Sequence, residues 1–155
     1  MNISRVVGFA AVAGLLLSVP AWTQEKKIQR SDLPRAVEKT VAEQSQGAII
    51  RGFSQEKENG QTFYEAELLV NGHSKDVLMN GEGDVVEVEE QVALDSLSPV
   101  VRGGLQAKAR KGKLVKVESL TKKGQLVAYE GKVVTDGKRS EVQVGPDGRP
   151  LEHEE

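Results

Sequence analysis

The chain has 155 residues, of which 28% are charged and only 4% aromatic, and it contains no cysteine. Its 21 lysine and arginine residues against 23 aspartate and glutamate residues give a net charge of −2, whereas a nucleic-acid-binding domain is expected to be strongly basic. The lack of cysteine excludes disulfides, thiolate metal sites and cysteine nucleophiles. At this length we expect one domain or two small repeats, stabilised by the hydrophobic core and with no nucleic-acid partner.

The first 21 residues have the pattern of a secretory signal peptide. Arg5 precedes an apolar run over 6–19. Pro20-Ala21 follows, and the small residue Ala21 suits the position just before a signal-peptide cleavage site. The run is shorter than the roughly 20 residues that span a bilayer as a helix, so we expect cleavage near Ala21 and no transmembrane span after it; an uncleaved N-terminal anchor is the alternative. The pattern predicts a bacterial protein that is periplasmic or secreted, with a flexible polar leader over 22–30.

The chain contains an internal repeat. Residues 47–90 align with 112–155 without a gap, and 11 of the 44 aligned positions are identical. The segments upstream of these align with a slip of one residue. A period of this length indicates two copies of one supersecondary unit, which we place at 31–93 and 94–155.

Each repeat is predicted to contain one helix followed by four strands. Pro34 in the first turn and an apolar residue at every fourth position favour a first helix that ends at Gly47. Ser98 is an N-cap residue that begins the second helix, and Gly112 ends it. Alternating apolar residues predict strands at 48–56, 61–71, 74–80, 84–90, 113–121, 125–135, 138–144 and 149–154.

Asn-Gly and Asp-Gly pairs join several of the predicted strands. They lie at 59–60, 71–72 and 136–137, and such pairs favour the tight turns of β-hairpins. Hairpins pair neighbouring strands in antiparallel fashion. We therefore predict an α+β fold of two tandem units, each with one helix and a four-stranded antiparallel sheet, and with the helices on one face of the combined sheet.

Alternation along the strands separates two faces of the sheet. The side chains that point to one face are apolar, and this face is expected to pack under the helices. The other face, here called the open face, is acidic with some apolar residues. An exposed aromatic side chain among carboxylates can anchor a partner, and Phe53 is a further candidate of this kind. The candidate binding residues of the open face are Phe63, Glu65, Glu67, Leu69, Glu87, Glu130 and Glu152, with Asp76, Glu89, Glu141 and Glu154 beside them. An ordinary solvated sheet face is the alternative.

The two repeats carry opposite net charge. Residues 22–93 contain 8 basic and 14 acidic side chains, whereas 94–155 contain 12 and 9. Basic side chains gather on the second helix and its exit, at Arg102, Lys108, Arg110 and Lys111. They form either a solubilising surface or a site for a small ligand or an anionic polymer of the cell envelope.

The sequence contains none of the short motifs that mark common enzyme active sites or phosphate-binding loops. Its two histidines, His73 and His153, are too few for a nucleophile–base pair or a histidine-rich metal site. We expect the acidic chain end from Glu152 to Glu155 to be solvated rather than to bind metal. We therefore predict a protein that is not an enzyme and has no cofactor and no metal; a small hydrolase using paired carboxylates is the alternative.

The repeat resembles the PepSY-like unit. The matching residues are Leu33-Pro34, Tyr64-Glu65, Asn71-Gly72 and Gly83 in the first repeat, and Leu97, Tyr129-Glu130, Asp136-Gly137 and Asp147-Gly148 in the second. The tandem arrangement is similar to exported proteins like the β-lactamase inhibitory protein (BLIP-like), whose two units form one continuous sheet with the helices on its convex side. PepSY units accompany secreted peptidases, which they are held to restrain, and BLIP-like proteins hold an enzyme on the concave sheet. The resemblance therefore implies non-catalytic binding of another exported protein.

Overall fold

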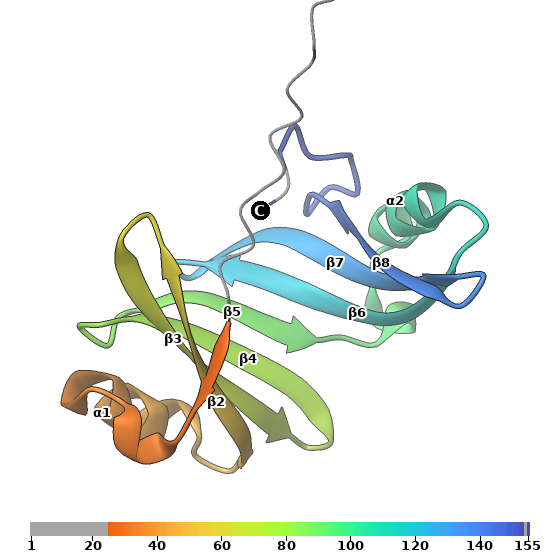
Figure 1. Ribbon diagram of the computed structural model, residues 1–155. Helices are drawn as coiled ribbons and strands as arrows, with labels where there is room; N and C mark the ends of the chain where they lie inside the picture. The colour runs from red at the N-terminus through yellow and green to blue at the C-terminus, as the bar shows by residue number, and fades with distance from the viewer. Residues whose placement is uncertain (1–24, 154) are drawn as a thin grey trace, which may run out of the picture.

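The structure is a computed structural model that describes residues 25–153 and 155. These residues form one antiparallel sheet of eight strands, each hydrogen-bonded to its neighbours in the sequence, and two α-helices (Figure 1). The strands are β1 (Lys26–Ile28), β2 (Ile49–Glu58), β3 (Gln61–Val70), β4 (His73–Asn80), β5 (Val85–Gln91), β6 (Lys113–Lys122), β7 (Gln125–Thr135) and β8 (Lys138–Val144). The helices are α1 (Arg35–Gln44) and α2 (Pro99–Ala109), preceded by the short 3-10 helices η1 (Arg30–Asp32) and η2 (Leu94–Ser96).

No helix within 25–153 or at residue 155 is both long and apolar enough to cross a membrane. The signal peptide predicted over 1–21 lies outside the described residues.

The prediction of two units with four strands each is wrong. Strand β5 of the first repeat pairs with β6 of the second, from Glu87 opposite Lys122 to Gln91 opposite Glu118, so the sheet is continuous. The second repeat contributes three strands, because the segment predicted as a strand after residue 148 forms none among its described residues. Pro150 stands at the start of that segment and has no amide hydrogen to donate to a strand ladder.

The first strand of the sheet comes from the segment expected to be a leader. Strand β1 pairs with residues 53–55 of β2 and covers that edge. Strand β1 itself holds no turn residues and one apolar side chain, Ile28, which packs against the first core. Burial of this side chain, together with the hydrogen bonds of a free sheet edge, explains why a polar segment forms a strand.

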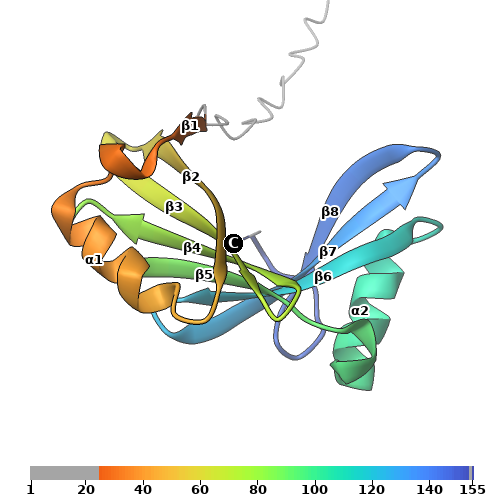
Figure 2. The same cartoon turned by 90° about the horizontal axis from the view of Figure 1, so that it is seen from below.

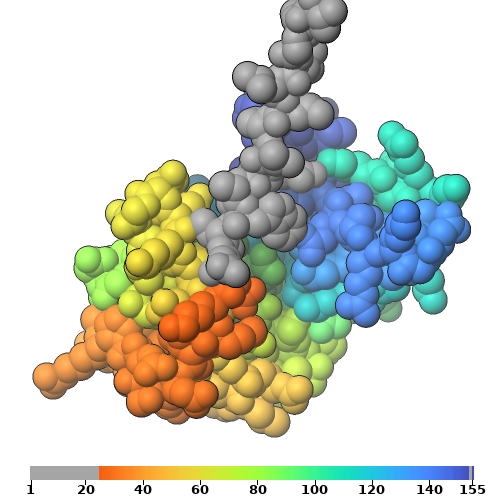
Figure 3. All heavy atoms as spheres, in the orientation of Figure 1, coloured from red at the N-terminus to blue at the C-terminus, as the bar shows by residue number. Residues whose placement is uncertain are grey.

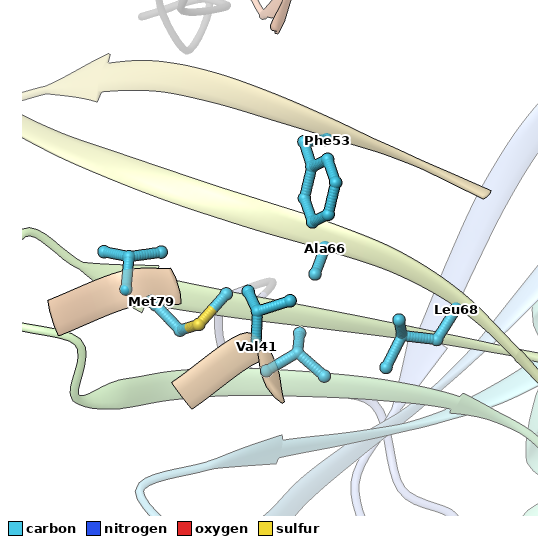
Figure 4. Close-up of a cluster of buried hydrophobic side chains, with 7 residues drawn as sticks. Val41, Phe53, Ala66, Leu68 and Met79 are labelled. Carbon is cyan, nitrogen blue, oxygen red and sulfur yellow. The ribbon is translucent and has the colours of Figure 1, made fainter. Parts of the chain in front are cut away.

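The first core lies between α1 and strands β2 to β4. Val37 and Val41 of α1 are 0% and 1% exposed, because the apolar stripe of the helix faces the sheet. The strand side chains buried with them are Phe53, Ala66, Leu68, Val77 and Met79, several of which Figure 4 shows around Val41.

The second core lies between α2 and strands β6 and β8, on the same side of the sheet. Ser98 caps α2, since its hydroxyl oxygen accepts a hydrogen bond from the amide of Val101 at 3.4 Å. The buried side chains of this core are Leu97, Val101, Leu105, Val117 and Val144. A single row of paired residues crosses the sheet from one core to the other, through Leu68, Lys75, Glu90, Ser119 and Tyr129. Side chains in such a row point to one face, so both helices cover the same face (Figure 2).

Equivalent glycines of the two repeats lie against the two helices. Gly83 follows β4 with φ +85°, and its carbonyl oxygen accepts a hydrogen bond from the Thr40 hydroxyl of α1 at 2.6 Å. Gly148 follows β8 with φ +78°, and a Cβ there would lie 2.3 Å from the carbonyl oxygen of Val100 in α2. Positive φ and the close helix both require glycine at these two positions.

Candidate binding face

The open face is the side of the sheet away from the two helices, and it is hollowed in two adjoining places. The smaller hollow, of about 220 Å³, is here called the acidic hollow, and it is lined by Glu56, Glu65, Asp76, Leu78, Glu87 and Glu89. The larger hollow, of about 660 Å³, includes Phe63, Val86 and Lys122 in its lining. Leu78 and Glu87 line both hollows, so the two are continuous.

Strand pairing places carboxylates side by side in and next to the acidic hollow. Glu67 lies opposite Asp76 across β3 and β4, and Asp76 lies opposite Glu89 across β4 and β5. Directly opposed side chains on one face have Cβ atoms about 4.5–5.5 Å apart. Three adjacent strands therefore place like charges side by side, an arrangement that destabilises a sheet when no counter-charge is present.

Several acidic residues of the open face have partners within the protein. Glu67 forms an ion pair with Lys27 of β1, and Glu87 pairs with Lys122 of β6 at 3.6 Å. Glu118, which is 1% exposed, accepts Lys116 at 2.5 Å on Oε1 and lies 3.4 Å from Lys132 through Oε2. Glu130, 6% exposed, lies 3.3 Å from Lys132 and accepts a hydrogen bond from Gln143 at 2.9 Å.

Three other acidic residues of the open face have no such partner. Within the described part of the chain, the carboxylates of Glu65, Asp76 and Glu89 form no hydrogen bond and no ion pair closer than 4 Å. All three are half-buried. A partly buried charge without a hydrogen-bond or ion-pair partner is unfavourable, because it has lost part of its hydration.

The pKa values of these three groups reflect burial, which the lysines nearby offset only in part. Burial raises the pKa of Glu65 to about 7, and repulsion from Asp76 adds to the shift. Burial also raises the pKa of Glu89 to about 8, with further repulsion from Glu130 and Glu118. The pKa of Asp76 is raised by burial and by the charge of Glu118. Each shift means that the ionised form is poorly stabilised in the protein alone.

The structure separates the apolar candidates. Phe63 lines the larger hollow, next to the carboxylates. Leu69 lies six residues further along the same strand, about 20 Å away at the rise of an extended chain, where it pairs with Ile49 and Ser74. Phe53 is 7% exposed and belongs to the core under α1, so its placement as an open-face candidate is wrong.

The chain end also differs from the prediction. Glu152 is exposed and lies outside any strand. Glu155 instead returns to the open face, where its backbone amide donates to Oε1 of Gln143 at 2.8 Å and its side chain lies 3.2 Å from Lys122.

The basic residues of the second helix do not form one cluster. Arg102 donates to the backbone carbonyls of Asp95 and Leu97 and so stabilises its own end of the helix. Arg110 is the C-cap residue of α2, with φ 52°, and exposed Lys111 lies 3.8 Å from Asp136. Lys108 is half-buried. A site for an anionic ligand that uses all four side chains gains no support from this arrangement.

Glu118 is the residue of the open face that the sequence analysis missed. The gapless repeat aligns Glu118 with Phe53, a core residue, whereas the strand register pairs Glu118 with Glu130 on the open face. An irregularity between Leu120 and Thr121 shifts the register of β6 by one residue. In the local sequence Lys116-Val117-Glu118, an apolar residue stands between two charged residues. This alternation places Glu118 on the face opposite Val117 and could have identified it as an open-face residue.

The comparisons with known proteins concern the fold. No protein-family model matches the sequence, and no curated protein matches it. Among solved structures, a DUF2874 family protein from Bacteroides ovatus matches with TM-score 0.59 and 22% identity over 77% of this chain and 85% of that chain. A protein from Bacteroides eggerthii described as periplasmic matches with TM-score 0.62 and 16% identity over 77% and 86%. A BLIP-like protein from Bacteroides fragilis matches with TM-score 0.56 and 16% identity over 77% and 83%. At these identities the similarity shows that the chain has a BLIP-like fold.

Proposed function

We propose that the chain is an exported, non-catalytic binding protein that holds a basic segment of another exported protein on its open face. The observation that carries the proposal is the group of three half-buried carboxylates, Glu65, Asp76 and Glu89, that lack a counter-charge in the acidic hollow. The periplasmic description of one structural neighbour and the BLIP-like description of another support this setting.

A lysine or arginine side chain of a partner fits the chemistry of this face. Its charge would supply the missing counter-ion for the acidic hollow, and a planar guanidinium can bind carboxylates through two parallel hydrogen bonds. Phe63 and Leu78 offer apolar surface beside the charges. An aromatic contact next to a buried ion pair is a common composition for the centre of a protein interface.

The proposal includes the PepSY-like relationship indicated by the repeat, with a secreted peptidase as the first class of partner to test. A signal peptide over 1–21 and its cleavage near Ala21 belong to the same proposal, since binding of this kind takes place outside the cytoplasm.

The test is capture of partners from the host's envelope and secreted fractions by three forms of the chain. The first is the wild type, and the second is the double variant Glu65→Lys/Asp76→Lys. The third, Glu43→Lys/Asp95→Lys, changes the net charge equally at exposed positions outside the two hollows.

We expect the wild type and the control to retain one protein in stoichiometric amount, less strongly as salt is added. The double reversal on the open face should weaken its binding at least tenfold, because disruption of a buried interfacial charge pair costs about 2–5 kcal/mol. Equal affinity for the open-face variant would exclude the acidic hollow as the binding site.

A further inference from the structure

We propose that two copies of the chain associate through strand β8, edge to edge and antiparallel, so that their two sheets become continuous. Strand β8 is the last strand of the sheet and pairs on one side only, with β7. Figure 2 shows it at the margin of the sheet. Its first four residues, from Lys138 to Glu141, are all exposed. The unpaired backbone groups of such an edge can form hydrogen bonds with a further strand.

The equivalent edge in the first repeat is covered by a strand. Strand β4 corresponds to β8 in the repeat, and it pairs with β5 on the side away from β3. The segment of the second repeat that corresponds to β5 forms no strand among its described residues. The edge of β8 is therefore open at the place where the first repeat has its next strand.

The hairpin between β7 and β8 determines which backbone groups of β8 face outward. The two turn residues, at 136–137, both have positive φ. A two-residue turn of this kind closes with a hydrogen-bonded pair, here Thr135 and Lys138. Because bonded and non-bonded positions alternate in an antiparallel pair, every second residue after Lys138 bonds to β7. Arg139 and Glu141 therefore direct their amide and carbonyl groups away from β7, toward a second strand.

The side chains at these two positions have opposite charges and lie on the same face of the sheet. Glu141 is opposite Lys132 on the open face, and Arg139 is two residues away along the strand. A two-fold axis at Ser140 would place Arg139 of each copy opposite Glu141 of the other, where the two residues would exchange both of their backbone hydrogen bonds. An axis at Glu141 would also satisfy the backbone, but it would oppose like charges. The order of the charges therefore favours the axis at Ser140.

The side chains of this edge are accessible to a second copy. Within the described part of the chain, the guanidinium of Arg139 forms no ion pair and no hydrogen bond. Glu141 lies 3.0 Å from Lys132, but its side chain is 52% exposed. Charged side chains on an edge usually disfavour pairing, whereas the alternating signs here favour pairing with an identical edge. A single strand pair makes a small interface, so we expect association to be weak and to depend on concentration.

The first test is sedimentation equilibrium of the chain, purified after export, at concentrations up to about 1 mM. The wild type should show a monomer–dimer equilibrium. Arg139→Glu or Glu141→Arg alone should weaken self-association at least tenfold, because each variant opposes like charges. An equimolar mixture of these two variants should restore the dimer, since every contact then joins a glutamate to an arginine. The matched controls Lys39→Glu and Glu43→Arg, at exposed positions of α1, should associate like the wild type.

The second test measures the register of the two strands. The chain contains no cysteine, so Ser140→Cys introduces a single thiol. It would face the same thiol of the other copy with Cα atoms about 4.5 Å apart, within range of a disulfide. Lys138→Cys, also exposed on β8, would face Val142 of the other copy and lie more than about 10 Å from its own counterpart. Mild oxidation should therefore form a covalent dimer of the first variant much faster than of the second.

Three results would overturn the proposal. The first is a monomer at every concentration, which would leave the edge of β8 to a strand of another protein. The second is a dimer that neither charge reversal weakens, or that the mixture of reversed variants does not restore. The third is equal cross-linking of the two cysteine variants, which would exclude the register at Ser140. None of these results bears on partner capture by the acidic hollow, which is measured separately.

Discussion

Individual carboxylates of the open face differ in what they contribute to stability. Glu67 and Glu87 have lysine partners, whereas Glu65 has none among residues 25–153 and 155. Because burial raises the pKa of Glu65 to about 7, above its value in the unfolded chain, the folded protein binds more protons than the unfolded one between roughly pH 4.5 and 7. Stability contributed at this position must therefore fall as pH rises through that interval.

The substitution Glu65→Gln tests this directly. At pH 4.5 the folded wild type carries a neutral carboxyl at this position, so the variant and the wild type should have similar free energies of unfolding. At pH 8 the wild type carries an uncompensated charge, and the variant should be the more stable of the two. Urea unfolding at both pH values measures the difference.

The control is Glu43→Gln, which removes one exposed carboxylate from α1 on the opposite side of the molecule. The difference in free energy of unfolding between Glu65→Gln and the wild type could instead stay constant from pH 4.5 to 8, or favour the wild type at pH 8. Either result would show that the Glu65 carboxylate has a counter-charge in solution.

At the scale of elements, the adjacent glycines of α2 have different roles. Gly103 is exposed, and a Cβ added there would meet no atom within 4 Å. A Cβ on Gly104 would lie 2.1 Å from the carbonyl oxygen of Gly148, in the turn after β8. One glycine thus weakens the helix without a packing reason, while its neighbour allows the helix to approach the turn.

Substitution by alanine at Gly103 and at Gly104 should therefore change the free energy of unfolding in opposite directions. Gly103→Ala is expected to raise the free energy of unfolding by about 0.5–1 kcal/mol, since alanine favours the helix and the site is open. Gly104→Ala should lower it by about 1–3 kcal/mol, because the helix must move away from the turn to admit the methyl group. Urea unfolding of the two single variants measures both free energies of unfolding. If both variants became more stable, or both less stable, the close contact between Gly104 and Gly148 would be contradicted.

The sequence was informative about elements whose signals are local. Asn71-Gly72 and Asp136-Gly137 adopt positive φ at both residues, as the hairpin prediction required, and Ser98 caps α2 as expected. The turn at Lys123-Gly124 has the same geometry but a lysine in place of the usual asparagine or aspartate, so its composition gave no comparable signal.

Features that depend on distant pairing could not be predicted in this way. Strand β1 forms only because β2 offers it an edge, and nothing in the polar sequence Lys26–Ile28 specifies that partner. The position of Glu118 depends on a register irregularity that a gapless repeat conceals. For the candidate site, the sequence identified an acidic face, but which carboxylates lack a counter-charge follows from the placement of lysines on neighbouring strands.

At the scale of the whole molecule, two cores share one sheet. The space-filling view in Figure 3 shows the first half, in orange to yellow-green, and the second, in cyan to blue, on opposite sides of the molecule. The ladder between β5 and β6 joins them through five residue pairs. Neither half can expose its inner strand without breaking hydrogen bonds to the other half, and loss of such a ladder leaves backbone groups unpaired.

The continuous sheet predicts that the two halves unfold together. Leu105 is 0% exposed in the second core, so Leu105→Ala should cost about 2–5 kcal/mol. The two tyrosines of the chain, Tyr64 and Tyr129, each pack against a different core. With fluorotyrosine incorporated, ¹⁹F NMR in increasing urea should show both signals losing native intensity at one midpoint, and Leu105→Ala should lower that midpoint equally for both. A shift of the Tyr129 signal alone would mean that the first core survives without the second, and that the β5–β6 ladder joins two separate folding units.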